Sequence, residues 1–509
     1  MKQALIKERE EVQKMKKGKR LIAMASAALM MLAMGGCGNS ASDSEVSNSA
    51  VESTASDSAS ESTVSNSGEE SNVSEPAGPV SITIGNWPAE TNAEALELKE
   101  KQKAEFEEQN QGVEVIPDTY RFEIQTFTAK ATAGQLPDLL SNLPYTEAKT
   151  VIKNGYAADI TDLAKEYGLL DAINPDVLDL CTDEEGRFYL LPNGVETPGI
   201  AINKELFRQA GLVNEDGTMM IPDTFEEVAE FASIVKEKTG VAGFVMPTTG
   251  NQGGWRFTNI AWNYGVEFEV QNEDGSWTAT FDCPEFHEAL QWLYDMKWTR
   301  KVLQDDMNVG GTEQQSIFGT GRAAMMFGSS AGAWTNRLVQ NSGMERENLA
   351  LGKMPAGPAG RYGQLGGTLQ MISSNTTPEQ REAIFKWLLY QNYTPEIDEE
   401  TFVEDLEMRT ESGNFIFAKE LTSIWDLEER SETIARLSEP YVNVDMRDFE
   451  TYNTEGVTLR TEPPACCQEL YATLDGVVQE VLTNENVDIP AISKKAQEDF
   501  QVNYLDKMD

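Results

Sequence analysis

The feature that most constrains the fold is an alternation of short apolar β runs with longer helical stretches, which begins at residue 80. Strand-like residues 80–84 precede a helical pattern at 93–109, and a second strand-like run at 113–116 precedes a helix near 124–133. A short apolar run at 138–141 continues the series. This order predicts an α/β fold in which parallel strands are flanked by helices. In such sheets a ligand binds beyond the carboxyl ends of the strands.

Length and charge narrow the possible classes. The chain has 509 residues, which favours two or more domains, and 40% of them are hydrophobic, which is enough for a large core. It carries 41 Lys and Arg against 84 Asp and Glu, a formal charge of -43. Because there is no basic excess to release counterions from phosphates, we exclude a protein that binds nucleic-acid backbones.

The N-terminal residues predict export from the cell. Residues 1–20 contain several lysines, and residues 21–34 form an uncharged apolar run that is too short for a permanent membrane-spanning helix. We therefore expect residues 1–36 to be a signal peptide. Translation could start at Met1 or at Met15, because the acids in the first stretch are unusual ahead of such a run.

The run ends in Met34-Gly35-Gly36-Cys37, which resembles the bacterial lipobox. The resemblance implies that Cys37 is lipidated and becomes the mature N-terminus, which would anchor the chain to the extracellular face of the cell membrane through two or three acyl chains. The alternative is a soluble secreted protein in which Cys37 is incidental. Residues 37–79 are rich in Ser and acids and have no aromatics, so we expect a disordered tether.

Several catalytic and cofactor sites are disfavoured. His287 is the single histidine and sits in a helical pattern, so Ser-His-Asp, Cys-His and His-rich metal chemistry are not expected. The cysteines have no CxxC or CxxH spacing. Residues 319–328 contain glycines but neither a dinucleotide fingerprint nor a P-loop, and a helix end that turns into a buried strand explains them better. We expect no metal, cofactor or nucleotide.

Segments of the folded part carry a family resemblance when they are taken in order. They are 134–140 (GQLPDLL), 155–163 (GYAADITDL), 199–212 (GIAINKELFRQAGL), 223–227 (DTFEE), 318–327, 354–358 (MPAGP) and 366–388. Together they resemble the extracellular solute-binding protein family 1, the sugar-binding lipoproteins of ABC importers related to maltose-binding protein. The resemblance spans about residues 82–390, and the segment at 203–212 is its most specific part.

The resemblance implies a type II periplasmic-binding-protein fold for residues 80–509. Two α/β lobes would be joined by crossing hinge strands and would close on a ligand in the cleft between them. It also implies that the chain is not an enzyme. It would capture a carbohydrate, which we expect to be an oligosaccharide, and deliver it to ABC permease subunits whose separate ATPase supplies the energy. We expect the chain to act as a monomer.

A sugar site needs aromatic platforms for apolar ring faces, and carboxylates and amides for the hydroxyl rim. Trp87, Trp255 and Trp334 follow strand ends or Gly-rich loops and are candidate platforms, although a place in the core is the alternative for each. Glu196 lies seven residues before Asn203, the spacing at which the maltose-binding relatives carry a ligand-binding carboxylate. Its alternative is a solvated loop acid.

Weaker candidates follow two other segments. Asn142 and Tyr145 come after the run at 138–141, where the relatives place an aromatic and an acid, a pattern from which this chain departs. Gly366 and Gly367 would let the main chain approach a ligand closely, although a plain turn is equally consistent.

Two other functions remain open from the sequence. A surface glycoside hydrolase would need two carboxylates at a defined separation, which the sequence does not give. A lipoprotein of the same fold could instead serve sensing or adhesion. The negative charge disfavours anionic ligands, but a local patch of arginines such as Arg187, Arg256 and Arg322 would override it.

Overall fold

The computed structural model describes residues 79–329 and 332–508. The expected signal peptide, the lipidation site Cys37 and the tether up to residue 78 lie outside the described residues. None of the helices in the described part is long and apolar enough to cross a membrane. The cysteines in the described part are free thiols: Cys181, Cys283, Cys466 and Cys467.

The first lobe is built on a sheet with the strand order β2-β1-β3-β12-β4. Strand β1 is parallel to β2 and β3, whereas β12 is antiparallel to β3 and β4. The strands are β1 (Val80–Ile84), β2 (Val113–Pro117), β3 (Leu139–Pro144), β4 (Leu190–Glu196) and β12 (Gly366–Ile372). The parallel strands confirm the α/β pattern predicted from the N-terminal half, and β12 joins them from a distant part of the chain.

The second lobe is built on a sheet with the order β10-β5-β9-β6. Its strands are β5 (Gly199–Asn203), β6 (Ala242–Phe244), β9 (Ala323–Gly328) and β10 (Leu349–Lys353). Every residue of β5 and β9 is buried, because helices cover both faces of this sheet. The strand predicted after the glycines at 319–328 is therefore confirmed as β9.

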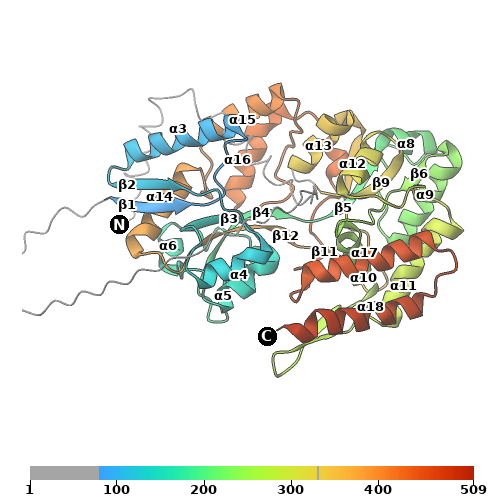
Figure 1. Cartoon of the computed structure of the whole chain (residues 1–509). Helices are drawn as coiled ribbons and strands as arrows, with labels where there is room; N and C mark the ends of the chain where they lie inside the picture. The colour runs from blue at the N-terminus through green and yellow to red at the C-terminus, as the bar shows by residue number, and fades with distance from the viewer. Residues whose placement is uncertain (1–78, 330–331, 509) are drawn as a thin grey trace, which may run out of the picture.

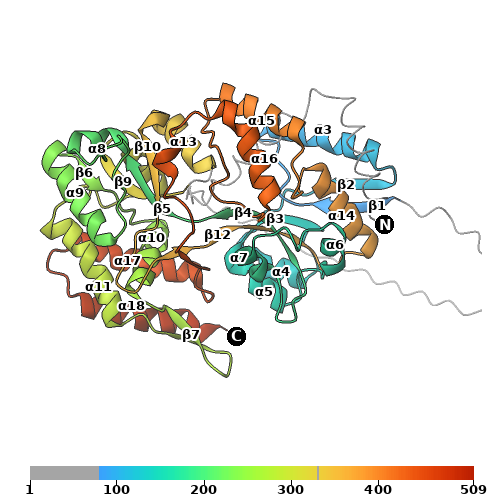
Figure 2. The ribbon, with the colours of Figure 1, turned by 180° about the vertical axis from the view of Figure 1, so that it is seen from behind.

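Helices surround both sheets, and Figures 1 and 2 show the two lobes side by side. The first lobe carries α3 (Ala93–Gln109), α4 (Ile124–Thr132), α5 (Ala148–Lys153), α6 (Thr161–Glu166), α7 (Pro175–Leu178) and α14 (Pro378–Tyr390). The second carries α8 (Lys204–Ala210), α9 (Phe225–Thr239), α10 (Gln252–Tyr264), α11 (Pro284–Tyr294), α12 (Gly311–Gly319), α13 (Gly332–Ser342), α17 (Cys467–Thr483) and α18 (Ile489–Asn503). The remaining elements are α15 (Glu399–Glu411), α16 (Glu428–Ser438) and the two-stranded pairs β7 (Glu269–Gln271) with β8 (Trp277–Ala279) and β11 (Tyr362–Gln364) with β13 (Thr458–Arg460).

Each lobe has its own hydrophobic core. Side chains such as Ile82, Phe106 and Trp387 pack together in the first lobe. The second sheet has a cluster on each face, and because side chains alternate along a strand, Ile200 enters one cluster and Ala201 the other. Two separately packed lobes can move as bodies about the segments that connect them.

The chain crosses between the lobes more than once. Strand β4 ends at Glu196 and β5 begins at Gly199 in the other lobe, while β11 leads into β12 in the return direction. The crossing strands are hydrogen-bonded neighbours, because Gly366 of β12 pairs with Glu196 of β4. Both strands run through the middle of the molecule in Figure 2. After α14 the chain passes between the lobes again, since Trp425 packs in the first core and Phe449 in the second.

The most specific segment of the resemblance has a structural explanation. Asn203 caps α8, because its side chain accepts a hydrogen bond from the Leu206 N–H at 3.2 Å. Gly211 ends the helix in the left-handed conformation, with φ of 78°. Lys204 lies between them and forms a buried ion pair with Asp448 of the 3-10 helix Met446–Phe449, with side chains only 10% and 2% exposed.

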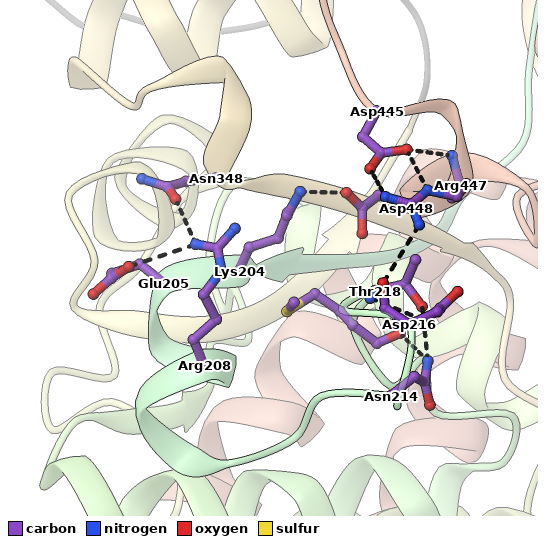
Figure 3. A network of polar contacts seen from close by, with 11 residues as sticks. Lys204, Glu205, Arg208, Asn214, Asp216, Thr218, Asn348, Asp445, Arg447 and Asp448 are labelled. Atoms are coloured by element: carbon purple, nitrogen blue, oxygen red, sulfur yellow. Dashed lines mark hydrogen bonds and ion pairs between the residues drawn. The ribbon is translucent and has the colours of Figure 1, made fainter.

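Figure 3 shows how this buried pair attaches the C-terminal segment to the second lobe. The neighbouring ion pairs, Arg447 with Asp445 and Arg208 with Glu205, are much more exposed. Exposed pairs contribute little to stability, whereas breaking a buried pair leaves an uncompensated charge. Of these three ion pairs, Lys204 with Asp448 is therefore the one that contributes most to holding residues 445–449 on the second lobe.

Candidate ligand site between the lobes

Glu196 lies at the end of β4, where the chain passes from the first lobe to the second. Its side chain is partly exposed, yet burial of the carboxyl group raises its pKa, and the fields of Arg256 and Arg337 oppose that rise. No hydrogen bond contributes to this shift among the described residues. The crossing therefore holds a partly exposed acid in the fields of two arginines, and no residue in the described part of the chain forms a hydrogen bond with its carboxylate.

Arg256 is the fifth residue of α10 and is only 4% exposed. Its guanidinium lies over the ring of Trp255, 3.8 Å from the ring centroid. The Nε and Nη1 atoms are buried without a hydrogen-bond partner in the described part of the chain. Burial lowers the pKa of Arg256 to about 10, and the nearby Glu196 carboxylate opposes this effect. The arginine remains charged at neutral pH and has unused donors.

Helix α17 positions the first turn of α10. The carboxylate of Asp475 accepts hydrogen bonds from the backbone N–H groups of Asn251 and Gly254, both at 2.7 Å. A Cβ atom on Gly254 would lie 2.2 Å from the carbonyl oxygen of Tyr471, so the two helices touch through a glycine. Trp255 and Arg256 are thus held by a helix from the C-terminal part of the chain.

Two asparagines of α10 attach this helix to β11, the strand that leads into β12. Asn259 accepts from the backbone N–H of Gln364 at 3.0 Å, and Asn263 accepts from that of Tyr362 at 2.9 Å. Asn263 also donates to the Tyr362 carbonyl at 2.8 Å. These amides replace a neighbouring strand along β11 and fix α10 relative to the crossing strands.

Acidic side chains from both lobes lie near the place where the chain crosses between the lobes. Glu462 accepts a hydrogen bond from the Tyr471 hydroxyl at 2.9 Å, and burial together with the charges of Glu147 and Glu196 raises its pKa to about 7. The pKa of Glu147 is raised by burial, and also by the charge of Glu469. Glu147 belongs to the first lobe and Glu469 to the second, so carboxylates of the two lobes face the same region.

An interlobe cavity of about 440 Å³ adjoins Glu462. Its volume falls in the range of small-molecule sites. The lining comes from α7 and the turn after it, from the end of α10 and the following chain, and from residue 365 with the segment 459–464. The lining residues are Pro175, Asp176, Asp179, Leu180, Trp262, Glu267, Phe268, Glu269, Leu365, Leu459, Arg460, Thr461, Glu462, Pro463 and Pro464. None of the eight ligand contacts predicted from the sequence lines this cavity.

The structure brings Glu196 and Trp255 into one region, but Trp87 is elsewhere. Trp87 is 2% exposed in the core of the first lobe, stacked on Trp387 with ring centroids 6.2 Å apart. Its indole N–H donates to the Glu100 carboxylate at 3.1 Å. With its ring packed and its N–H bonded, Trp87 is a core residue here, and the sequence interpretation of it as a ligand platform is corrected.

Tyr145 and the paired glycines also have structural roles. Tyr145 is 2% exposed, and its hydroxyl donates to the Gly194 carbonyl at 2.7 Å. A Cβ atom on Gly367 would lie 2.7 Å from the Tyr145 ring and 2.1 Å from the Gly194 oxygen. Gly367 therefore allows close packing of protein on protein. A Cβ atom on Gly366 would meet only the Glu196 carbonyl oxygen, at 3.5 Å, so this position is open.

Asn142 and Trp334 are the two remaining candidate ligand contacts. Asn142 is partly exposed and has a left-handed backbone, with φ of 61°. Trp334 is 3% exposed in the second lobe and packs on β9, where a Cβ atom on Gly328 would lie 2.5 Å from its ring. Its indole N–H is buried without a partner in the described part of the chain. Trp334 therefore contributes mainly to the core, with one unused donor.

The sequence analysis missed the roles of Arg337, Glu147 and Glu462, and it named Arg256 only as part of an arginine patch. That patch does not form, because Arg187 bonds with Asp183 on the first lobe and Arg322 is an exposed residue of the second. The position of Arg256 directly after Trp255 was the available signal. No sequence signal places Glu462 near Glu196, because the two residues are far apart in the chain and come close only in the folded structure.

Comparison with known proteins identifies the family of the chain. The profile of the family described as bacterial extracellular solute-binding protein matches residues 89–390. A putative binding protein of Brucella abortus is 26% identical over 324 residues, which cover 60% of this chain and 70% of that protein. Within the described residues, no cluster of His, Cys, Asp or Glu is arranged to hold a metal ion.

Solved structures share the fold at low sequence identity. Maltose-bound MalE3 of T. maritima has a TM-score of 0.56 and 20% identity, covering 83% of this chain and 100% of that one. UgpB of Mycobacterium tuberculosis, in complex with glycerophosphocholine, has a TM-score of 0.58 and 15% identity, covering 84% and 98%. These likenesses show the two-lobed α/β fold, and the family profile spans more than half of the sequence. The chain therefore belongs to the bacterial extracellular solute-binding protein family.

Proposed function

We propose that this protein is a lipid-anchored receptor of an ABC importer that captures a carbohydrate, an oligosaccharide in the first instance, and passes it unchanged to membrane permease subunits. In this proposal residues 1–36 are removed, Cys37 carries the acyl chains, and residues 37–79 form the tether. The mature protein acts as a monomer on the extracellular face of the cell membrane.

The observation that carries the proposal is the group formed by Glu196, Arg256 and Trp255 at the crossing between the lobes. The guanidinium has buried donors without partners in the described part of the chain, and the partly exposed Glu196 carboxylate lies in its field. Because buried polar groups are normally hydrogen-bonded, such groups call for a ligand that supplies the missing bonds. An aromatic ring beside charged donors and acceptors suits the mixed surface of a sugar.

Thermal denaturation with a panel of oligosaccharides tests the binding function. A bound ligand raises the midpoint by mass action. We expect stabilisation by at least one oligosaccharide, with the sugar recovered intact after prolonged incubation. Cleavage products would support a glycoside hydrolase instead, and no response to any glycan would contradict carbohydrate binding.

The anchor is tested separately in cells. Cys37→Ala removes the only thiol that the lipobox could lipidate, so we expect the protein to appear in the medium instead of the membrane fraction. Cys283→Ala, at a partly exposed thiol of the folded part, is the matched control and should leave the protein in the membrane. Membrane retention of the Cys37 variant would contradict the lipid anchor.

A further inference from the structure

Helix α10 begins with a sequence that does little to stabilise its own first turn. Its N-cap residue, Asn251, has a left-handed backbone with φ of 63°, and its side chain makes no capping hydrogen bond to α10 in the described part of the chain. The first turn has no acidic residue, and its second and third residues are Gly253 and Gly254. The first N–H groups of a helix have no partner within that helix, and glycine leaves the backbone free to move. This end of α10 therefore depends on other parts of the chain.

Asp475 of α17 supplies the missing cap. One oxygen of its carboxylate accepts a hydrogen bond from the backbone N–H of Gly254, and the other accepts from that of Asn251, both at 2.7 Å. Asp475 is only 8% exposed, and a Cβ atom on Gly253 would lie 2.8 Å from its Oδ1 atom. A negative charge also interacts favourably with the N-terminal end of a helix. Asp475 thus caps α10 from another helix, and the glycines of α10 leave room for its approach.

Two further contacts show that one face of α17 holds the whole segment before α10. The backbone carbonyl of Gln468 accepts a hydrogen bond from the Asn251 side chain at 3.0 Å. The side chain of Gln479 donates to the Thr248 carbonyl at 2.8 Å. Gln468, Asp475 and Gln479 are separated by seven and then four positions, a spacing that places them on one side of a helix. The contact is therefore a continuous face, with Asp475 at its centre.

We infer that Asp475 is a positioning residue of the ligand site, which sets ligand affinity by fixing the start of α10 without contacting the ligand. This inference rests on the proposed function, in which Trp255 and Arg256 bind the ligand. These two residues follow Gly254 directly, so a change in the direction of the first turn moves both side chains. The inference also extends the binding site to α17, which lies beyond the residues 89–390 that match the family profile.

The physical reason is preorganisation. The Arg256 guanidinium lies 3.8 Å from the centroid of the Trp255 ring, and its buried Nε and Nη1 atoms have no partner in the described part of the chain. A ligand that bonds these donors binds best when they already point in one direction, because ordering a segment on binding reduces affinity. Without the Asp475 carboxylate, the two glycines would populate several backbone conformations. If one molecule in about ten keeps the binding geometry, the affinity falls about 10-fold.

The first measurement needs no ligand. Asp475→Asn keeps the size of the side chain but replaces one acceptor oxygen with an N–H donor, so we expect faster amide hydrogen exchange in residues 251–256. Gln479→Ala also removes a contact to this segment and should change the exchange in the same direction. Asp488→Asn is the matched control, because Asp488 caps α18 of the same lobe by accepting from the Ala491 N–H at 3.1 Å. Exchange that is as slow in Asp475→Asn as in this control would overturn the inference.

Binding is then measured with the oligosaccharide that stabilises the wild-type protein most, at a temperature where every variant is folded. Asp475→Asn should weaken binding about 10-fold, whereas Asp488→Asn should bind normally. If Trp255→Ala weakens binding and Asp475→Asn does not, the inference is overturned and the proposed function stands. Unchanged binding in Trp255→Ala would contradict the proposed site itself.

A double variant shows whether Asp475 acts through Trp255. The combined Asp475→Asn, Trp255→Ala variant should lose less affinity than the product of the two single losses, because the direction of a ring that is absent no longer matters. A role in stability alone would not produce this dependence. Losses that multiply fully would show that Asp475 acts independently of Trp255 and would overturn the inference.

Discussion

Two regions of this protein that hold opposite charges differ in whether those charges form an ion pair. Lys204 and Asp448 are in direct contact and attach the C-terminal segment to the second lobe. Arg256 and Glu196 are held apart at the crossing between the lobes. The contrast teaches that burial of charge alone does not identify a ligand site, and the proposal that Arg256 and Glu196 bind a ligand depends on the missing ion pair between them.

Breaking the ion pair between Lys204 and Asp448 should have the largest effect on stability. Asp448→Ala leaves the Lys204 ammonium buried without its acid, so we expect the free energy of unfolding to fall by about 3–5 kcal/mol. Urea denaturation measures this change. Asp499→Ala, which removes the exposed partner of Lys495 on α18, should cause no measurable loss. Equal stability of the two variants would remove the basis of the comparison.

The acidic side of the crossing should make stability depend on pH. Burial raises the pKa of Glu462 to about 7 from its ordinary value of 4.5, so the folded state keeps a proton that the unfolded chain loses. As pH rises from about 4.5 to about 7, this group lowers the free energy of unfolding, by at most about 3 kcal/mol.

Denaturation curves across this pH range check the effect. Glu462→Gln should flatten the dependence, whereas Glu205→Gln, at an exposed glutamate of α8, should leave it unchanged. A slope that persists in Glu462→Gln would assign the proton to another group.

The two crossing glycines should respond very differently to a methyl group. Gly367→Ala places a Cβ atom against the Gly194 oxygen and the Tyr145 ring, and we expect a loss of about 1–3 kcal/mol in the free energy of unfolding. Gly366→Ala meets only ordinary van der Waals contact and serves as the matched control. Equal losses at both positions would show that packing does not explain the difference.

Substitutions at Trp255 and Glu196 should weaken ligand binding and leave the free energy of unfolding nearly unchanged. Trp255→Ala and Glu196→Ala should each weaken oligosaccharide binding by about 1–3 kcal/mol, through loss of the ring surface or of a hydrogen-bond acceptor. Titration calorimetry measures the affinity, and Trp387→Phe in the first core is a control that should keep it. Full affinity in both site variants would mean that the ligand lies elsewhere, with the 440 Å³ cavity as the next candidate.

Much of the fold follows from local sequence patterns. The strands at 80–84 and 113–116, the cap of α8 at Asn203 and the hairpin of β7 and β8 each depend on residues close together in the chain. The insertion of β12 beside β3 and β4 depends on contacts between distant segments, and periodicity alone does not supply them.

The candidate site was less predictable for the same reason. Glu196 and Trp255 were named as candidates because they flank recognisable segments, whereas Trp87 follows a strand in the same way but turns into the core. The distinction comes from Trp387, a partner 300 residues away in the sequence. Likewise, Glu462 comes near Glu196 only because the chain passes between the lobes again after α14.

One measurement tests the central contrast most directly: the thermal midpoint of an Arg256→Met, Glu196→Leu double variant, with and without a stabilising oligosaccharide. If these charges await a ligand, their removal should leave the midpoint of the ligand-free protein unchanged or higher and should abolish the shift caused by the sugar. A midpoint lowered as far as that of Asp448→Ala, or a sugar-induced shift that persists, would contradict the account.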